Sequence, residues 1–140
     1  MYEFLSYRVA DFMSRAGITL SRSTPLEEAE RLFHTHGFNL LPVVDGSRLV
    51  GVLTKLDFLK AFSFRSEALI PQYEAILARA TETVMSKDPA TVEPDLPLTR
   101  VLEKMIDTRY KSFPVVHEGD LVGVISREDV VRALRQAARR

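Results

Sequence analysis

The sequence has 140 residues, of which 46 % are hydrophobic and 27 % charged, and these globular proportions exclude disorder, collagen and coiled coil as descriptions of the whole chain. Its 19 basic and 19 acidic residues balance, which argues against nucleic acid or an anionic membrane as a partner, and the absence of cysteine excludes disulfides and thiol chemistry. With no long apolar run and no secretory leader in the sequence, we expect a cytoplasmic protein without a membrane partner.

The chain contains a tandem repeat. Residues 13–62 align with residues 85–134 without a gap, and the identical letters cluster as MS, PVV and LVGV. Two copies indicate a pseudo-twofold pair of units rather than a solenoid, which needs about three or more shorter repeats. We therefore expect a first repeat unit at 1–70 with an N-terminal lead-in helix, and a second at 71–140 with a connecting helix.

Each repeat is expected to read as short helix, strand, helix, strand, strand, helix. Residues 4–12 should form the lead-in helix, because they correspond to a later helical segment. In the next helix, Thr24 is predicted as the N-cap, with Pro25 at the first helical position and Glu27 completing a capping box. Gly37 should end that helix.

A hairpin and a further helix follow. LLPVVD (40–45) and RLVGVLT (48–54) are predicted strands joined by an Asp-Gly turn, and the second repeat has SFPVVH (112–117) and LVGVIS (121–126). The segment 63–84 between the repeats should form the connecting helix after Pro71. Nearly continuous apolar strands require cover on both faces. We therefore predict an α/β fold in which each unit is a small, mainly three-stranded sheet with flanking helices.

Catalytic and metal-binding patterns are weak. His34 and His36 lie two residues apart on a predicted helix, so they point in different directions and cannot share a metal. Gly46 and Gly51 have the spacing of a phosphate loop, but the required Lys-Ser/Thr does not follow. We nominate no catalytic residue and no metal ligand, and a nucleotide-processing enzyme stays only as a third hypothesis.

A motif that we call the hydroxyl–aspartate motif occurs twice: Thr54 with Asp57 in GVLTKLD, and Ser126 with Asp129 in GVISRED. One interpretation is purely structural, because a hydroxyl at the N-cap and an acid at N3 form a capping box. The other is functional, because a helix N-terminus after a strand suits a phosphate and the aspartate can accept hydrogen bonds from a ribose. The duplication, with a glycine three residues before each hydroxyl, favours the functional interpretation.

Three segments recur in the same order in both repeats: VADFMS and TETVMS, PVVD and PVVH, and the two hydroxyl–aspartate motifs. In this order and twice over, they resemble a pair of cystathionine-β-synthase-type (CBS) domains at about residues 9–62 and 81–135. The resemblance implies a regulatory ligand-binding module rather than an enzyme. It also implies sites in clefts between the two units for adenosine-containing ligands such as AMP, ADP, ATP or S-adenosylmethionine.

The resemblance assigns roles residue by residue. Both hydroxyl–aspartate motifs would hold ribose and phosphate. The base would be lined by backbone and apolar contacts from Ile18, Thr19, Leu41, Pro42, Ala90, Thr91, Phe113 and Pro114. The phosphate candidates are Lys55, Arg109, Lys111 and Arg127. Because Arg109 and Lys111 have only Gly37 and Asn39 as counterparts, we expect phosphates to be drawn toward the second repeat, although both cations could equally be solvated loop charges.

Two functional hypotheses stand ahead of the enzyme. The chain is either a sensor of adenine nucleotides that signals to a separate effector protein, or a ligand-free module for dimerisation and scaffolding. The resemblance implies a homodimer in both cases. Which nucleotide binds, and whether one site or both are filled, stays open.

Overall fold

The computed structural model describes residues 2–15, 17–63 and 73–139. The predicted boundary after residue 70 and the predicted helix start at Pro71 lie outside the described residues. The chain divides into two compact units. The terminal unit consists of Met1–Gly17 and Ala90–Arg140, and the central unit consists of Ile18–Pro89. Each is mixed α/β, as expected.

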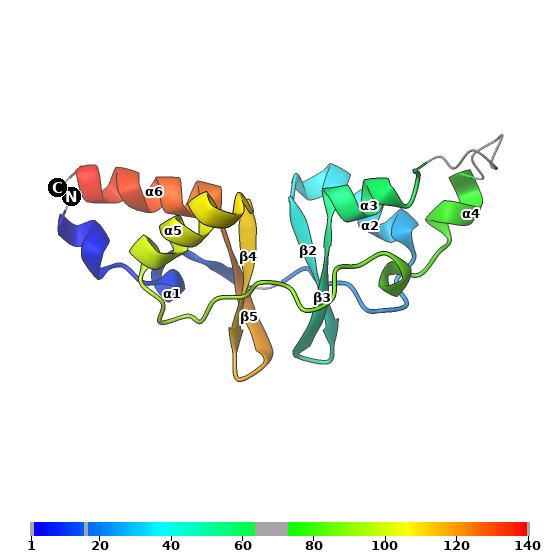
Figure 1. The fold of residues 1–140 in the computed structure, drawn as a ribbon, viewed down its shortest axis with the longest axis horizontal. Helices are drawn as coiled ribbons and strands as arrows, with labels where there is room; N and C mark the ends of the chain where they lie inside the picture. The colour runs from blue at the N-terminus through cyan, green and yellow to red at the C-terminus, as the bar shows by residue number, and fades with distance from the viewer. Residues whose placement is uncertain (1, 16, 64–72, 140) are drawn as a thin grey trace. The chain divides into compact units, whose positions relative to one another are not determined.

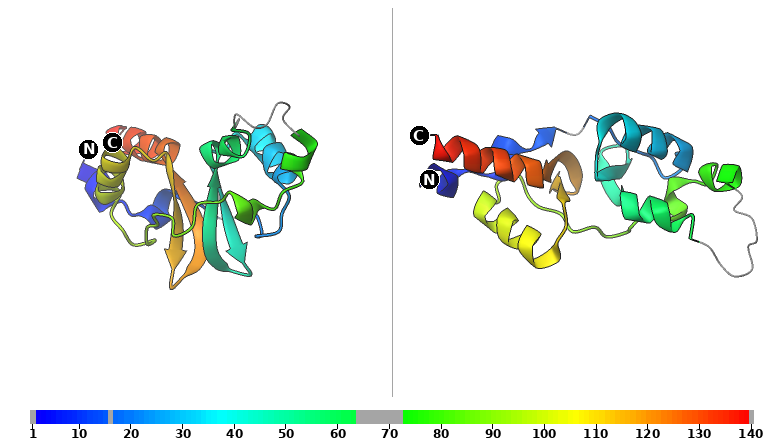
Figure 2. Two further views of the ribbon diagram at one scale, coloured as in Figure 1. Left: turned by 45° about the vertical axis from the view of Figure 1, so that its right-hand side comes forward. Right: turned by 90° about the horizontal axis from the view of Figure 1, so that it is seen from above.

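The terminal unit contains three antiparallel strands with β5 in the middle, between β1 and β4. Its elements are the 3-10 helix η1 (Tyr2–Ser6), α1 (Val9–Phe12), β1 (Ser14–Arg15), α5 (Leu98–Thr108), β4 (Ser112–His117), β5 (Asp120–Ser126) and α6 (Arg127–Ala138). Helices α5 and α6 lie beside the β4–β5 hairpin, and η1 lies along the end of α6 (Figures 1 and 2).

The central unit is built around the β2–β3 hairpin, whose register pairs Leu40 with Thr54 and Leu41 with Leu53. Its elements are α2 (Leu26–His36), β2 (Leu40–Asp45), β3 (Arg48–Thr54), α3 (Lys55–Lys60), α4 (Tyr73–Leu77) and the 3-10 helix η2 (Thr81–Thr83). The structure confirms the predicted hairpins of both repeats. It also confirms Gly37 as the end of α2, with a φ of 66° in the left-handed region.

Each unit encloses its own apolar core. The core of the central unit is formed by Leu20, Leu26, Ala29, Leu32, Phe33, Leu41, Val43, Leu53 and Met85. That of the terminal unit includes Phe4, Val9, Phe12, Leu98, Val101, Met105, Phe113, Val115, Ile125 and Val130. The cores follow from the amphipathic spacing of α2 and α5 and from the apolar hairpin strands.

The two compact units are composed differently from the expected units at 1–70 and 71–140. Ser14 in β1 pairs with Val124, so the N-terminal segment packs on the second repeat. Equivalently, Ser86 pairs with Val52 of the first repeat. These contacts are close, because a Cβ added to Gly51 would lie 2.8 Å from the Ser86 carbonyl oxygen. The opening segment of each repeat therefore completes the unit of the other repeat.

Three local predictions are corrected. Pro25, not Thr24, is the N-cap of α2, because the Thr24 hydroxyl accepts from the Ser21 N–H at 2.9 Å instead. The first strand expected in each repeat is reduced to a single parallel bridge, Leu20 with Val43 in one and Val92 with Val115 in the other. The lead-in helix is divided into η1 and α1, and the described part of the connecting helix into α4 and η2.

Candidate functional site

The first hydroxyl–aspartate motif lies where β3 ends and α3 begins. The Asp57 N–H donates to the Thr54 hydroxyl oxygen at 3.0 Å, and the Thr54 N–H donates to Asp57 Oδ2 at 3.1 Å. This reciprocal pair is the capping box that the sequence predicts. Asp57 is only 7 % exposed, so its carboxylate is held close to the protein interior at the start of the helix.

Asp57 has a further partner that sequence reasoning missed. Ser86 Oγ donates to both carboxylate oxygens of Asp57, at 3.1 and 3.0 Å. Ser86 is held there by two backbone hydrogen bonds with Val52, at 2.8 and 3.0 Å. The repeated Met-Ser pair in the sequence marks this serine, but it does not indicate which strand the serine contacts.

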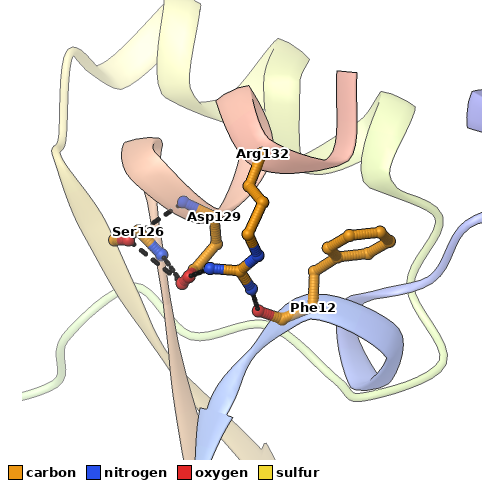
Figure 3. Close-up of polar contacts among 4 residues, drawn as sticks. All are labelled: Phe12, Ser126, Asp129 and Arg132. Carbon is orange, nitrogen blue, oxygen red and sulfur yellow. Dashed lines mark hydrogen bonds and ion pairs between the residues drawn. The ribbon is translucent and has the colours of Figure 1, made fainter. Parts of the chain in front are cut away.

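The second motif lies where β5 ends and α6 begins (Figure 3). Asp129 Oδ2 accepts from the Ser126 N–H at 2.9 Å and from the Ser126 hydroxyl at 3.0 Å. The Asp129 N–H donates to the same hydroxyl oxygen at 3.3 Å. Asp129 is 5 % exposed. The two motifs therefore have the same capping geometry and nearly the same burial.

Arg132 distinguishes the second motif from the first. Its guanidinium donates to Asp129 Oδ1 at 3.1 Å and to the Phe12 carbonyl oxygen at 2.8 Å (Figure 3). It also lies over the Phe12 ring, 5.6 Å from the centroid. The sequence reasoning missed Arg132, although a cation three residues after an acid on a helix is a recognisable pairing signal.

Three of the four phosphate candidates come together at the start of α6. The Arg127 guanidinium donates to the Arg109 carbonyl at 2.7 Å, and the Arg127 N–H donates to the Lys111 carbonyl at 2.9 Å. All three residues are exposed. The fourth candidate, Lys55, is exposed at the start of α3, and its N–H donates to the Asn39 carbonyl at 3.3 Å. The structure thus brings the backbone of Arg109 and of Lys111 to Arg127 at the start of α6, and the role of the three side chains stays a prediction.

The residues predicted to line the base fall into two classes. Ile18, Thr19, Ala90 and Thr91 are half-buried or exposed, and they lie in the segments just before the parallel bridges. Leu41 and Phe113 are core residues, and Pro42 and Pro114 are also buried. The side chains of Leu41 and Phe113 are therefore committed to packing, and the first class is better placed for contact with a ligand.

Other chemistries have little support in the described residues. No three His, Asp or Glu side chains in 2–15, 17–63 and 73–139 form a group that could hold a metal ion. His34 and His36 are exposed, and His36 stacks on Phe38. None of the described helices combines the length and apolarity that crossing a membrane requires.

Curated proteins with similar sequences are mostly much longer. Inosine-5'-monophosphate dehydrogenase of Korarchaeum cryptofilum is 33 % identical over 124 residues, covering 88 % of this chain but 23 % of that protein. A-adding tRNA nucleotidyltransferase of Geobacter sulfurreducens is 27 % identical over 131 residues, which is 14 % of its length. The chain thus spans a quarter or less of each.

Solved structures match over nearly the whole chain. CBSX2 from Arabidopsis thaliana has 28 % identity and a TM-score of 0.82, covering 96 % of this chain and 98 % of that one. CBSX2 in complex with AMP has 28 % identity and a TM-score of 0.80, with 94 % and 98 % covered. The CBS domain pair of protein MJ0100, in complex with 5'-methylthioadenosine and S-adenosyl-L-methionine, has 27 % identity and a TM-score of 0.72, again with 94 % and 98 % covered.

The family comparison agrees with the repeat. The CBS domain matches twice, at residues 9–63 and 81–136, and these ranges contain both hairpins and both hydroxyl–aspartate motifs. The chain therefore belongs to the CBS domain family, of which it carries a tandem pair.

Proposed function

We propose that this chain is a regulatory module that binds adenosine-containing nucleotides through its two hydroxyl–aspartate motifs and passes the signal to a separate effector protein. The observation that carries the proposal is the duplicated, nearly buried carboxylate at the start of a helix, Asp57 at 7 % and Asp129 at 5 % exposure. Two similar structures hold adenosine-containing ligands: AMP in one, and 5'-methylthioadenosine with S-adenosyl-L-methionine in the other.

The ribose is the part of the ligand that fits these carboxylates. Its two neighbouring hydroxyls are donors, and a carboxylate has about four acceptor positions on its two oxygens. The capping bonds of Asp57 use one position on Oδ2, and the other contact is a neutral serine hydroxyl. Hydrogen bonds to an ionised acceptor are about twice as strong as neutral ones, so the aspartates favour a diol over a single hydroxyl.

The phosphate is the second recognised group. Arg127 is an exposed cation at the start of α6, where the helix N-terminus also favours negative charge, and the exposed residues Arg109 and Lys111 are joined to it through their carbonyl groups. A ligand with phosphates therefore gains more at the terminal unit than a nucleoside does. The sulfonium group of S-adenosylmethionine is positively charged, so these cations should not increase its binding affinity.

Thermal unfolding with a ligand panel tests the proposal. AMP, ADP, ATP, S-adenosylmethionine and 5'-methylthioadenosine are compared with their guanosine counterparts. A ligand at 100 times its dissociation constant adds about 2.7 kcal/mol, which is roughly 5 to 10 °C for a chain of this size. We expect a shift with at least one adenine ligand and a smaller shift with its guanine counterpart.

Matched variants connect the shift to the motifs. Asp57→Asn and Asp129→Asn keep an oxygen that can accept the capping bond but remove the charge, and Asp107→Asn removes an exposed acid from α5 as the control. We expect the double variant Asp57→Asn/Asp129→Asn to lose the adenine-dependent shift and the control to keep it. An unchanged shift in the double variant, or no shift with any adenine ligand, would contradict the proposed function.

A second candidate function is a ligand-free dimerisation and scaffold module. The observation in its favour is that both motifs already form complete capping boxes, which account for the hydroxyl and the aspartate without a ligand. On this hypothesis the wild-type protein shows no thermal shift, and the Asn variants change stability only slightly. The same panel therefore separates the two functions.

A homodimer is part of the proposal under both functions. Leu56 and Leu59 are exposed on α3, and Ile106 and Val131 are exposed on α5 and α6, so the helices of each unit carry uncovered apolar side chains. Light scattering after size exclusion should give twice the chain mass of 15.9 kDa. Leu59→Glu and Val131→Glu should lower that mass, whereas Arg135→Glu, at another exposed position of α6, should not.

A further inference from the structure

The two buried aspartates differ in the residue outside the motif that contacts the carboxylate. Asp57 is contacted by the neutral hydroxyl of Ser86, at 3.1 and 3.0 Å. Asp129 Oδ1 is contacted by the guanidinium of Arg132, at 3.1 Å. The residue at the position of Arg132 in the first repeat is Lys60, an exposed residue at the end of the short helix α3. One carboxylate is therefore paired with a cation and the other with a hydroxyl.

We propose that Arg132 competes with the ribose of a bound nucleotide for Asp129, so that the Asp57 motif is the tighter of two unequal ribose sites. This inference rests on the proposed function and adds the residue that makes its two sites unequal. Binding at Asp57 requires only that a serine hydroxyl turn away or share the carboxylate. Binding at Asp129 requires the ligand hydroxyls to displace a charged donor.

Arg132 is held in place by more than Asp129. Its second nitrogen donates to the Phe12 carbonyl at 2.8 Å, and its guanidinium lies 5.6 Å from the centroid of the Phe12 ring. These contacts connect α6 to the end of α1 within the terminal unit (Figure 3). Three contacts fix the guanidinium at Asp129. Its displacement therefore costs more free energy than the displacement of an unrestrained side chain.

The size of the effect follows from the two kinds of hydrogen bond. Both contacts have an ionised acceptor, but the Arg132 contact adds the attraction between two opposite charges, which corresponds to about a factor of five in an equilibrium constant. The Arg132 side chain is 53 % exposed, so solvent screening reduces its share. We expect the Asp129 motif to bind about three- to tenfold more weakly than it would without Arg132.

Another role for Arg132 predicts the opposite result. If its guanidinium turned toward the phosphate of a ligand, removal of Arg132 would weaken the binding of AMP and leave adenosine unaffected. Competition at the ribose predicts instead that AMP and adenosine gain affinity equally, because both carry the same diol. The pair of ligands therefore separates the two roles without knowledge of the physiological nucleotide.

The experiment is calorimetric titration of the full chain with AMP and with adenosine. Asp57→Asn removes the competing motif, and Arg132→Ala and Arg132→Gln are then introduced in that background. Arg135→Ala, which removes an exposed arginine one turn further along α6, is the control. We expect Asp57→Asn/Arg132→Ala and Asp57→Asn/Arg132→Gln to bind both ligands about three- to tenfold more tightly than Asp57→Asn, and the control to match Asp57→Asn.

Unchanged or weaker binding in both Arg132 variants would overturn the inference, while wild-type binding would leave the proposed function standing. If the wild-type chain bound no adenine ligand in calorimetry or thermal unfolding, both would be overturned. The expected gain in affinity is a readout that mere structural damage does not produce, because loss of fold weakens binding. Arg132→Gln keeps a neutral donor and serves if the alanine variant unfolds.

Discussion

Ser86 Oγ lies 3.1 and 3.0 Å from the two carboxylate oxygens of Asp57, and so connects the opening segment of the second repeat to α3, the helix that follows β3. The equivalent serine of the other repeat, Ser14, lies in β1 and is exposed. The same letters therefore have different contacts in the two units, because the arginine rather than the serine holds the aspartate of the terminal unit.

Ser86→Ala should destabilise the protein more than Ser14→Ala. The substitution removes a donor from a carboxylate that is only 7 % exposed, and a hydrogen bond to a charged group contributes about 1.5 to 3 kcal/mol. We expect the free energy of unfolding to fall by about 1 to 2 kcal/mol for Ser86→Ala, and by less than about 0.5 kcal/mol for the exposed control. Urea denaturation measures both, and equal losses would contradict the assigned contact.

Gly51→Ala and Gly123→Ala should both be strongly destabilising. A Cβ at Gly51 would lie 2.8 Å from the Ser86 carbonyl oxygen, and one at Gly123 would lie 2.6 Å from that of Ser14. Backbone atoms cannot rotate away, so the paired segments must move, at a cost of about 1 to 3 kcal/mol.

Gly17→Ala is the control for the glycine pair, because its Cβ would meet nothing within 4 Å. Thermal unfolding should show a lower Tm for the two tight positions and little change for the control. A Tm for Gly51→Ala equal to that of the control would show that the segment ending in Ser86 does not pack against β3.

Much of the fold was predictable because its signals are local. The Asp-Gly turn and the apolar letters of 40–45 and 48–54 predict a hairpin, and Gly37 predicts the end of α2. The pairing of Ser14 with Val124 was not predictable from such signals, because it joins segments more than a hundred residues apart. The expected units at 1–70 and 71–140 follow the order of the repeats and stay a prediction, whereas the compact units follow the packing.

The candidate site likewise has local contacts, which the sequence predicts, and a long-range contact, which it does not. Thr54 with Asp57 and Ser126 with Asp129 are three residues apart, so the chain itself brings each pair together. Ser86 lies 29 residues from Asp57, and the sequence does not indicate that contact. Nor does composition distinguish the core residue Leu41 from a side chain available to a ligand, because both are simply apolar letters in a strand.

Arg109→Gly should stabilise the protein, whereas Gly37→Ala should destabilise it. Both residues end a helix in the left-handed region, with φ of 63° and 66°, but only glycine adopts that region without a steric penalty. We expect a gain of about 0.5 to 1 kcal/mol for Arg109→Gly and a loss of about 1 kcal/mol for Gly37→Ala. Arg109→Lys, which keeps the charge and a Cβ in the left-handed region, should leave stability unchanged in urea denaturation.

Nucleotide titration of the same variants tests the phosphate role of Arg109. If its side chain contacts a phosphate, Arg109→Gly weakens ATP binding more than adenosine binding while Arg109→Lys keeps most of it. Opposite changes in stability and affinity would exclude a general loss of structure as the cause. If Arg109→Gly weakened the binding of adenosine as much as that of ATP, a role at the phosphate would be contradicted.

Thr54→Ala and Ser126→Ala should each cost about 1 kcal/mol of stability, because each removes the hydroxyl that caps a helix. Thr54→Ser and Ser126→Thr keep the hydroxyl and should cost much less, so the difference within each pair isolates the cap. Urea denaturation gives the stability, and titration with AMP and adenosine gives the second readout. If the hydroxyls also donate to a phosphate, the alanine variants lose more affinity for AMP than for adenosine. If they act only as caps, the stability falls and the ratio of the two affinities does not change.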